Sequence, residues 1–307
     1  MTNPFIHCID ITIVARDGFP LKGTIYEPVS QQIKAVIQIN PGWGLHQFIY
    51  TNFAHYFVEQ GYAVLTFDYR GIGKSTIPFD RIRKFDARMS DYGILDMPAV
   101  LDWLIEHYPD KQKIVIGHSL GGQIIGLMDN CEKIDRIYTI GSAIGYFKNL
   151  RKPMNLLLPH LFFKIVPLYS WVYKHSSILK PVLNRYLGIT AASVTEWKEW
   201  CNNPDYFRPY LSTSISKHYF ENIYAPFISI RVEDDPYAND VTTPLLLSNY
   251  SNAKIKIIKI TLKEAQERKI GHTGFFRIKH KKIWNIILDD LEAVFVKQKI
   301  SPIQASA

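Results

Sequence analysis

The feature that most constrains the fold of this chain is the Gly-His-Ser-Leu-Gly turn at residues 117–121. The β-branched run Ile114–Ile116 precedes it and a helical pattern follows it. A serine in such a strand–turn–helix has a strained backbone, and the neighbouring chain passes too close for a Cβ at Gly117 or Gly121. We therefore predict a nucleophile elbow, in which the Ser119 hydroxyl stands at the edge of a sheet.

Strand-like runs alternate with helical patterns along most of the chain, which is typical of an α/β fold with a mostly parallel sheet covered on both faces. Ile9–Val14 and Leu21–Tyr26 are predicted to open the sheet as an antiparallel hairpin. The other predicted strands, each expected to be buried on both faces, are Ala35–Ile39, Ala63–Phe67, Lys113–Ile116, Arg136–Ile140, Phe227–Val232 and Lys254–Ile260. The predicted helices are Thr51–Gln60, Tyr92–His107, Leu120–Asp129 and Lys282–Lys297.

One segment, from about Tyr146 to Asn222, interrupts this alternation, since it has no strand pattern and prolines divide its helical pieces. It is rich in leucine and aromatic residues, which in an α/β chain indicates a helical cap over the carboxyl ends of the strands. We therefore divide the chain into a core at 1–145 and 223–307 and a cap at 146–222. The cap's longest lipophilic run, Leu156–Val172, contains prolines and a lysine and falls short of the roughly 20 apolar residues that cross a bilayer, so no transmembrane helix is predicted.

Two groups that follow predicted strands could form a proton relay with Ser119. A serine nucleophile needs a base within hydrogen-bond reach and an acid that orients the base, and in one α/β fold these occur in the chain order serine, acid, histidine. His272 follows the last predicted strand in a glycine-containing loop, and we assign the base to it. Asp235, which precedes a proline turn, is the favoured acid, and Asp234 and Glu233 remain alternatives.

Two backbone amides are predicted to stabilise a negative charge that develops next to Ser119. One is the amide of Leu120, at the start of the helix after the serine. The other is the amide of Trp43, because the loop Asn40–Gly44 follows a strand and its glycine allows a sharp turn toward the serine.

Two further histidines adjoin these groups in the sequence. His118 precedes the serine, but neighbouring side chains in an elbow point apart, so it either lines the pocket or packs in the interior. His46 lies near the loop that carries Trp43. We take both histidines as candidate substrate contacts.

The segment Asp68–Ser75 ends in Gly-Lys-Ser, as a phosphate-binding P-loop does, but an aspartate stands where a P-loop needs its first glycine. We interpret it as a structural turn in which Asp68 and Arg70 bond the backbone. The sequence contains neither a zinc-binding H-E-x-x-H motif nor a dinucleotide fingerprint after a strand. No metal and no cofactor is therefore predicted.

Composition limits the environment and the partners. An apolar content of 47% excludes a disordered chain, and the net charge of +8 fits a solvated surface or transient contact with an anionic membrane. The basic residues do not form a nucleic-acid-binding motif, so no nucleic-acid partner is predicted. The three distant cysteines suggest no disulfide framework, and the N-terminus has no signal pattern, so we expect a reducing, cytoplasmic location. The oligomeric state cannot be predicted.

Taken in chain order, the motifs resemble the α/β-hydrolase superfamily. They are Asn-Pro-Gly at 40–42, the turn at 68–75, Gly-His-Ser-Leu-Gly-Gly at 117–122, Asp-Asp-Pro at 234–236 and Gly-His-Thr-Gly-Phe-Phe at 271–276. The chain looks closest to bacterial hydrolases near the monoacylglycerol lipase and serine aminopeptidase group. The resemblance implies an eight-stranded sheet, a helical cap and a triad of Ser119, Asp235 and His272.

The sequence thus predicts a serine hydrolase that cleaves an ester, with a lipophilic acyl group indicated by the aromatic residues of the cap. The same triad would also serve an acyltransferase or a peptidase. A ligand receptor with the same fold is a third interpretation, but such proteins usually lack a triad member, and none is missing here.

Overall fold

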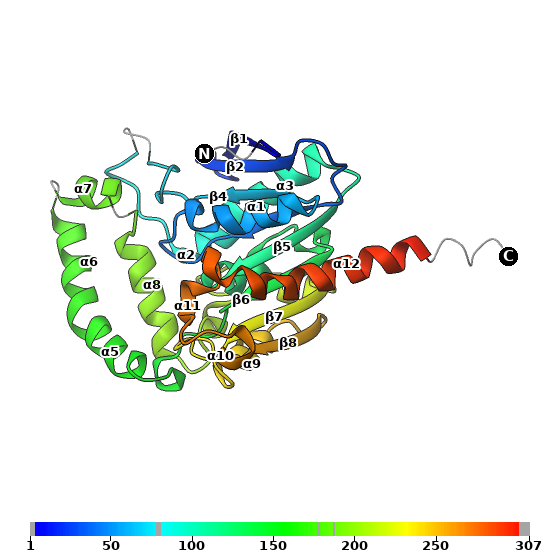
Figure 1. Ribbon diagram of the computed structural model, residues 1–307. Helices are drawn as coiled ribbons and strands as arrows, with labels where there is room; N and C mark the ends of the chain where they lie inside the picture. The colour runs from blue at the N-terminus through cyan, green and yellow to red at the C-terminus, as the bar shows by residue number, and fades with distance from the viewer. Residues whose placement is uncertain (1–3, 78–80, 177–178, 187, 301–307) are drawn as a thin grey trace.

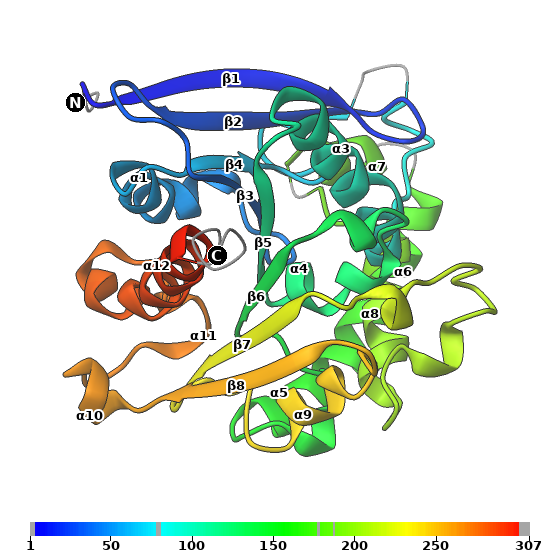
Figure 2. The same cartoon turned by 90° about the vertical axis from the view of Figure 1, so that its right-hand side faces the viewer.

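The computed structural model describes residues 4–77, 81–176, 179–186 and 188–300. These residues form one eight-stranded sheet in the order β1-β2-β4-β3-β5-β6-β7-β8, which confirms the predicted fold class (Figures 1 and 2). The pairs β1–β2 and β2–β4 are antiparallel and all other pairs are parallel. The strands are β1 (Ile6–Val14), β2 (Pro20–Pro28), β3 (Ala35–Asn40), β4 (Ala63–Phe67), β5 (Gln112–His118), β6 (Arg136–Ile140), β7 (Pro226–Val232) and β8 (Lys254–Ile260).

Helices cover both faces of the sheet and bury two separate apolar cores (Figure 2). The helices α1 (Thr51–Glu59) and α12 (Asn285–Ile300) lie on one face, and α3 (Met97–His107) lies on the other. Every residue of the central strand β3 is buried. A parallel strand in this position needs a mostly apolar sequence, which is why these runs were predictable, and the buried amide of Gln38 donates to the Asn40 side chain.

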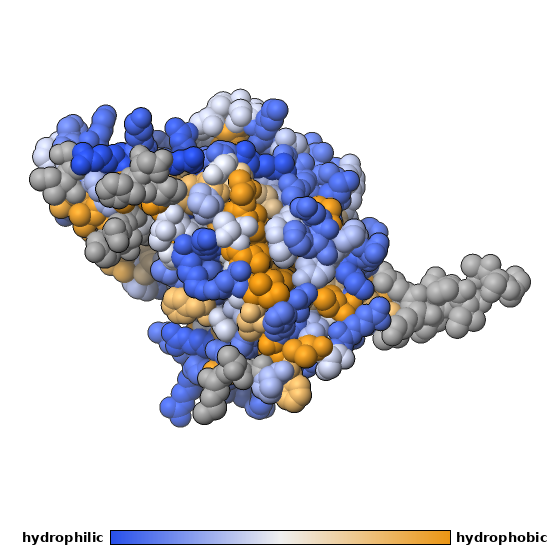
Figure 3. All heavy atoms as spheres, turned by 90° about the horizontal axis from the view of Figure 1, so that it is seen from above, coloured by the Kyte–Doolittle hydropathy of each residue, from blue (hydrophilic) through white to orange (hydrophobic). Residues whose placement is uncertain are grey.

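The two edges of the sheet differ from the interior. β8 bonds only to β7, and six of its seven residues are exposed or half-buried, so the prediction that this strand is buried on both faces is wrong. Its lysines alternate with isoleucines, a pattern that keeps an edge strand solvated. β1 forms the opposite edge, and a stripe of hydrophobic residues crosses that face of the molecule (Figure 3).

The helix after the serine turn is much shorter than predicted. α4 spans only Leu120–Gln123, and a 3₁₀ turn, η3 (Ile125–Leu127), replaces the rest of the expected helix. Gly126 packs so tightly on Phe220 that a Cβ there would lie 2.2 Å from the ring. The Gly126 carbonyl accepts a hydrogen bond from the Tyr219 backbone, 2.6 Å away, instead of from a following helical turn. A contact nearly a hundred residues away therefore ends the helix.

Two helices contain a π-helical segment two residues before a proline. One is η2 (Tyr92–Asp96), ahead of α3 and Pro98, and the other is η6 (Leu161–Ile165), ahead of Pro167. Because proline has no backbone N–H, it would leave a carbonyl of an α-helical turn unpaired, and the wider π turn accommodates this loss. As a result α5 (Met154–His160), η6 and α6 (Val166–His175) form one continuous helix of 22 residues.

We call this 22-residue helix, Met154–His175, the outer helix. The predicted run Leu156–Val172 is part of this longer helix, which is the one helix among the described residues that could cross a membrane by length and composition alone. It belongs to the segment between β6 and β7, together with α7 (Leu179–Tyr186) and α8 (Ala191–Asn202). In Figure 1, α8 stands between α6 and the sheet.

The glycine-rich turn after β4 is structural, as expected. The Asp68 carboxylate accepts hydrogen bonds from the backbone N–H groups of Gln47 and Lys74, 2.7 and 2.8 Å away. The prediction for Arg70 is wrong, because its guanidinium does not bond the turn. It forms ion pairs with Asp17 and Asp96, at 2.7 and 2.6 Å.

Candidate active site

The serine turn has the predicted strained geometry. Ser119 directly follows β5, precedes α4 and has φ 50° and ψ −117°, a conformation that non-glycine residues rarely adopt. A Cβ at Gly117 would lie 2.5 Å from the Cα of Gly122, which explains the glycine before the serine. The Ser119 N–H donates to the Ile140 carbonyl at 3.0 Å, and the Ser142 hydroxyl donates to the Ser119 carbonyl at 2.9 Å. The next strand, β6, and its loop therefore hold the turn in place.

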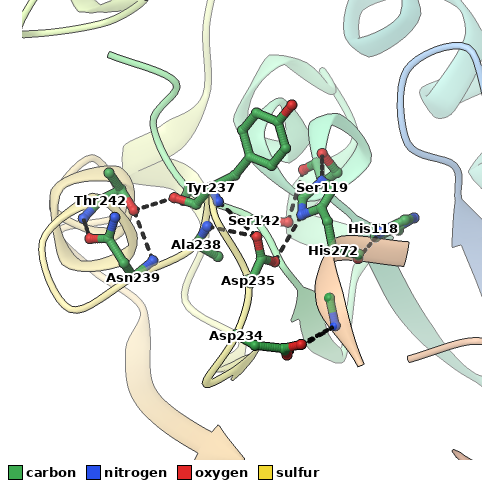
Figure 4. A network of polar contacts seen from close by, with 12 residues as sticks. His118, Ser119, Ser142, Asp234, Asp235, Tyr237, Ala238, Asn239, Thr242 and His272 are labelled. Carbon is green, nitrogen blue, oxygen red and sulfur yellow. Dashed lines mark hydrogen bonds and ion pairs between the residues drawn. The ribbon is translucent and has the colours of Figure 1, made fainter. Parts of the chain in front are cut away.

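The structure brings Ser119, His272 and Asp235 together from three loops at the carboxyl edge of the sheet (Figure 4). His272 lies on the short helix α11 (Gly271–Gly274), after β8. Its Nε2 is 2.9 Å from the Ser119 hydroxyl, and its Nδ1 is 2.8 Å from the Asp235 carboxylate. If Nδ1 carries the proton and donates to the carboxylate, Nε2 is free to accept the serine proton. The serine hydroxyl, the imidazole and the carboxylate thus contact one another in the order that a proton relay requires.

The three neighbouring acids of the loop after β7 have separate roles. Asp235 alone faces the imidazole, and its side chain is 1% exposed. Asp234 points away and accepts hydrogen bonds from the backbone N–H groups of Ile270 and Gly271, both at 2.9 Å (Figure 4). Glu233 accepts from the Leu262 N–H at 2.9 Å. The alternatives that the sequence left open are thus distinguished by their contacts, and Asp235 is the acid beside His272.

Backbone amides hold the Asp235 carboxylate in position. Its second oxygen accepts hydrogen bonds from the N–H groups of Tyr237 and Ala238, at 2.8 and 3.1 Å. The Thr242 hydroxyl accepts from the Asn239 N–H at 3.0 Å and donates to the Tyr237 carbonyl at 2.6 Å, which closes the loop on itself (Figure 4). These donors compensate the burial of a carboxylate and leave one oxygen facing His272.

The loop after β3 brings Trp43 to the cavity that Ser119 also lines. The N–H of Gly42 donates to the Tyr50 hydroxyl at 2.9 Å, so this amide is already used. Within the described part of the chain, no hydrogen bond is recorded from the N–H of Trp43 or of Leu120. Both residues line the same cavity as Ser119. Two unused amides beside a nucleophile are what an oxyanion site requires.

The structure places the candidate substrate contacts His118 and His46 outside the lining of the cavity, and for His118 it shows the interior packing that the sequence analysis left open. His118 is fully buried, where its Nδ1 accepts from the Tyr50 hydroxyl at 2.9 Å and its Nε2 donates to the His272 carbonyl at 3.1 Å. Burial, with a smaller contribution from neighbouring His272, lowers the pKa of His118 to about 3, so the ring is neutral near pH 7. His46 is exposed beside Phe48, outside the cavity lining.

His118 therefore connects the two loops that meet at Ser119. The contacts run from the Gly42 amide through Tyr50 and His118 to the backbone of His272. Tyr50 was missed by sequence reasoning, because nothing in its local pattern separates it from an ordinary core tyrosine. Its role arises from contacts across 68 residues.

Above the serine lies an apolar cavity of about 280 Å³. Its lining includes Trp43, Met89, Ile144, Trp197, Tyr206 and Tyr237. The rings of Trp43 and Trp197 are 5.1 Å apart, so the loop after β3 and helix α8 meet over the site. Trp197 was predicted only as part of an aromatic cap, and Tyr237, whose ring lies 4.7 Å from that of His272, was not predicted. The described residues contain no cluster of metal-ligating side chains.

Comparisons with known proteins agree with the observed fold. Residues 36–164 match the family model described as the alpha/beta hydrolase fold. No curated protein matches the chain.

Among solved structures, an esterase from Pyrococcus furiosus superposes with a TM-score of 0.57 at 16% identity, covering 94% of this chain and 93% of its own. An esterase from Exiguobacterium antarcticum gives 0.56 at 13% identity, covering 92% and 100%. A thermophilic esterase from Thermogutta terrifontis gives 0.54 at 13% identity, covering 93% and 99%. At such identities the similarity shows the fold only.

Proposed function

We propose that this chain, which has the α/β-hydrolase fold, is a serine hydrolase that cleaves carboxylic esters through an acyl-enzyme. The observation that carries the proposal is the continuous line from the Ser119 hydroxyl through the His272 ring to the buried Asp235 carboxylate, with contacts of 2.9 and 2.8 Å. The assignment to the monoacylglycerol lipase and serine aminopeptidase branch remains a prediction.

Each part of this site has a defined step in the proposed reaction. The Ser119 oxygen attacks the ester carbonyl while His272 Nε2 takes its proton, and Asp235 stabilises the resulting imidazolium. The amides of Trp43 and Leu120 bind the oxyanion of the tetrahedral intermediate. The imidazolium then protonates the leaving alcohol as the C–O bond breaks, which leaves the acyl group on Ser119. Water, deprotonated by His272, attacks this acyl-enzyme, and the carboxylic acid leaves as the serine regains its proton. The protein's own groups suffice for these steps.

The shape of the cavity supports a lipophilic acyl group as the substrate moiety. Its walls are mainly aromatic and aliphatic, and its volume of about 280 Å³ is at the small end of ligand sites. We expect p-nitrophenyl esters of medium chain length to be cleaved with a higher kcat/KM than the acetate. An optimum at acetate would contradict the lipophilic preference.

Labelling with a fluorophosphonate probe tests the nucleophile directly. The wild-type protein should be labelled at Ser119, and the Ser119→Ala variant should not be labelled. His46→Ala is the matched control, since His46 is exposed and outside the cavity, and its labelling should equal that of the wild type. Labelling of Ser119→Ala at the wild-type rate would refute the proposal. Adding competing alcohols or amines to the ester assay separates hydrolysis from acyl transfer.

A further inference from the structure

The outer helix has two unlike faces. Phe162, Val166 and Tyr173 on its inner face are buried, and the Tyr173 hydroxyl donates to the Phe85 carbonyl at 2.7 Å. On the outer face the side chains of Phe163, Leu168 and Trp171 remain 66%, 63% and 61% exposed. Further exposed apolar side chains on this helix are Leu156, Leu157 and Ile165. Such a concentration on one element is uncommon on a soluble surface and marks an interaction site.

The segment of the sequence that contains the outer helix is basic and lacks acidic residues. Between Asp135 and Glu196 the chain has no aspartate or glutamate, although this stretch contains eight lysines and arginines. Lys164 and Lys174 are exposed on the outer helix among its apolar side chains, and no ion pair is recorded for them among the described residues. Lysines with apolar stems suit a boundary between hydrocarbon and anionic headgroups.

We propose that the outer helix docks this protein on the surface of an anionic phospholipid bilayer, lying in the plane of the interface. A helix of 22 residues is about 33 Å long and could cross a bilayer by length. Crossing would require the buried inner face to leave the body of the protein. Docking along the helix lets Phe163, Leu168 and Trp171 enter the headgroup boundary while the inner face stays packed.

A second copy of this chain is a poorer occupant of the surface. In an isologous dimer the outer helix would face its own copy, and because it has lysines but no aspartate or glutamate, like charges would oppose each other. An anionic bilayer supplies the complementary charge and an apolar layer at once. The inner face of the outer helix adjoins the cavity, because the ring of Phe162 lies 5.1 Å from the ring of Trp197, which lines the cavity.

Co-sedimentation with vesicles tests this proposal. The full chain should bind vesicles of phosphatidylcholine mixed with phosphatidylglycerol, and bind vesicles of phosphatidylcholine alone at least tenfold more weakly. The double variant Leu168→Ser/Trp171→Ser should lower the partition coefficient at least tenfold, because it removes two apolar side chains that would enter the interface. Lys164→Glu/Lys174→Glu should lower it by at least tenfold at low salt and less at high salt.

Matched control variants distinguish binding through the outer helix from nonspecific hydrophobic binding and from an effect of net charge. Tyr224 and Ile278, which are 68% and 55% exposed, lie outside the cap, and Tyr224→Ser/Ile278→Ser should bind as the wild type does. Lys254→Glu/Lys256→Glu on the edge strand β8 makes the same change in net charge as Lys164→Glu/Lys174→Glu. It should alter vesicle binding less than threefold. Far-ultraviolet circular dichroism establishes that all variants are folded.

Trp171 provides an independent signal. The fluorescence difference between the wild type and Trp171→Phe should shift to the blue with anionic vesicles and be quenched by brominated lipid. The proposal is overturned if the cap variants bind as well as the wild type, if both lysine pairs lose binding equally, or if neutral vesicles bind equally well. It is also overturned if, without lipid, the wild type is a dimer that Leu168→Ser/Trp171→Ser disperses. Binding by Ser119→Ala should equal that of the wild type, so the result is independent of the proposed enzymatic activity.

Discussion

The carboxyl edge of the sheet and the outer helix differ in how far the rest of the protein pairs or covers their side chains. At the edge, the acidic side chains all have hydrogen-bond partners: both oxygens of the buried Asp235 accept hydrogen bonds, and Asp234 and Glu233 hold separate backbone amides. On the outer helix, apolar side chains remain exposed and the cations lack acids nearby in the sequence. The acids of the edge are therefore paired within the protein, whereas the apolar side chains on the outer face of the outer helix are left largely uncovered by the rest of the described residues.

This difference indicates a division of labour. In the proposed function, the edge would determine which bond is broken, because strand ends and hydrogen bonds fix its three side chains. In the proposed docking, the outer helix would determine where the protein works, because its outer face contributes little to the packed core. Substitutions at the two places should therefore have very different effects on catalysis.

The largest effect is expected from the edge itself. Replacing His272 by alanine removes the base that contacts Ser119 at 2.9 Å and should lower kcat/KM for a soluble ester by about 10⁴-fold or more. His46→Ala, at an exposed histidine outside the cavity, should stay within twofold. Steady-state kinetics measure kcat/KM for both variants. Equal losses of kcat/KM would contradict the proposal that the carboxyl edge, and not the surface around it, carries the activity.

The two adjacent aspartates should differ by orders of magnitude. Asp235→Asn removes the charge that orients and stabilises the imidazolium and should lower kcat by about 10³ to 10⁴-fold. Asp234→Asn weakens hydrogen bonds to the Ile270 and Gly271 amides and should lower kcat by only about tenfold. A larger loss in Asp234→Asn than in Asp235→Asn, measured at saturating substrate, would reverse the assignment of the acid.

The buried histidine between the loops should give an intermediate effect that depends on pH. His118→Phe leaves the Tyr50 hydroxyl and the His272 carbonyl without their partner, so near pH 7 it should lower the free energy of unfolding by about 1 to 3 kcal/mol. Because burial lowers the folded-state pKa of His118 from 6.5 to about 3, the unfolded chain binds the proton more readily. The wild type therefore loses stability as the pH falls through this interval.

The difference in the free energy of unfolding between the wild type and His118→Phe should consequently become smaller below about pH 6.5, by up to about 1.4 kcal/mol per pH unit. Urea unfolding of both proteins at several pH values between 4 and 7 measures the difference, in which other titrating groups largely cancel. A constant deficit across this range would show that His118 is not held neutral.

The smallest effect is expected on the outer helix. Leu168→Ser and Trp171→Ser change side chains that are 63% and 61% exposed, so each should alter the free energy of unfolding by less than about 0.5 kcal/mol. Their kcat/KM for a soluble short-chain ester should stay within twofold of the wild type. A tenfold loss in this assay without vesicles would show that the outer face supports the site directly.

The sequence predicted the features that depend on local pattern. The central strands are recognisable because burial on both faces demands continuous apolar runs, and the serine turn because close backbone approach demands glycine at 117. Chain order then indicated which acid and which histidine follow strands at the same edge. The structure brings these residues together at the expected positions.

Features that depend on distant contacts were not predictable in this way. The helix after Ser119 ends early because Gly126 meets Phe220, and His118 is buried because Tyr50 lies beside it. The choice between Asp234 and Asp235 likewise depends on which carboxylate meets the backbone of residues 270 and 271. None of these contacts leaves a periodic or spacing signal near the residue that it affects.

The opposed directions of Asp234 and Asp235 make the loop after β7 sensitive to length. Asp234 anchors the backbone of the two residues that precede His272, and the adjacent residue, Asp235, orients the His272 ring. Deleting or inserting a single residue before this pair would change which carboxylate faces the His272 ring and which faces the Ile270 and Gly271 amides. The number of residues between β7 and Asp235 is therefore as important to the site as the identity of the acid.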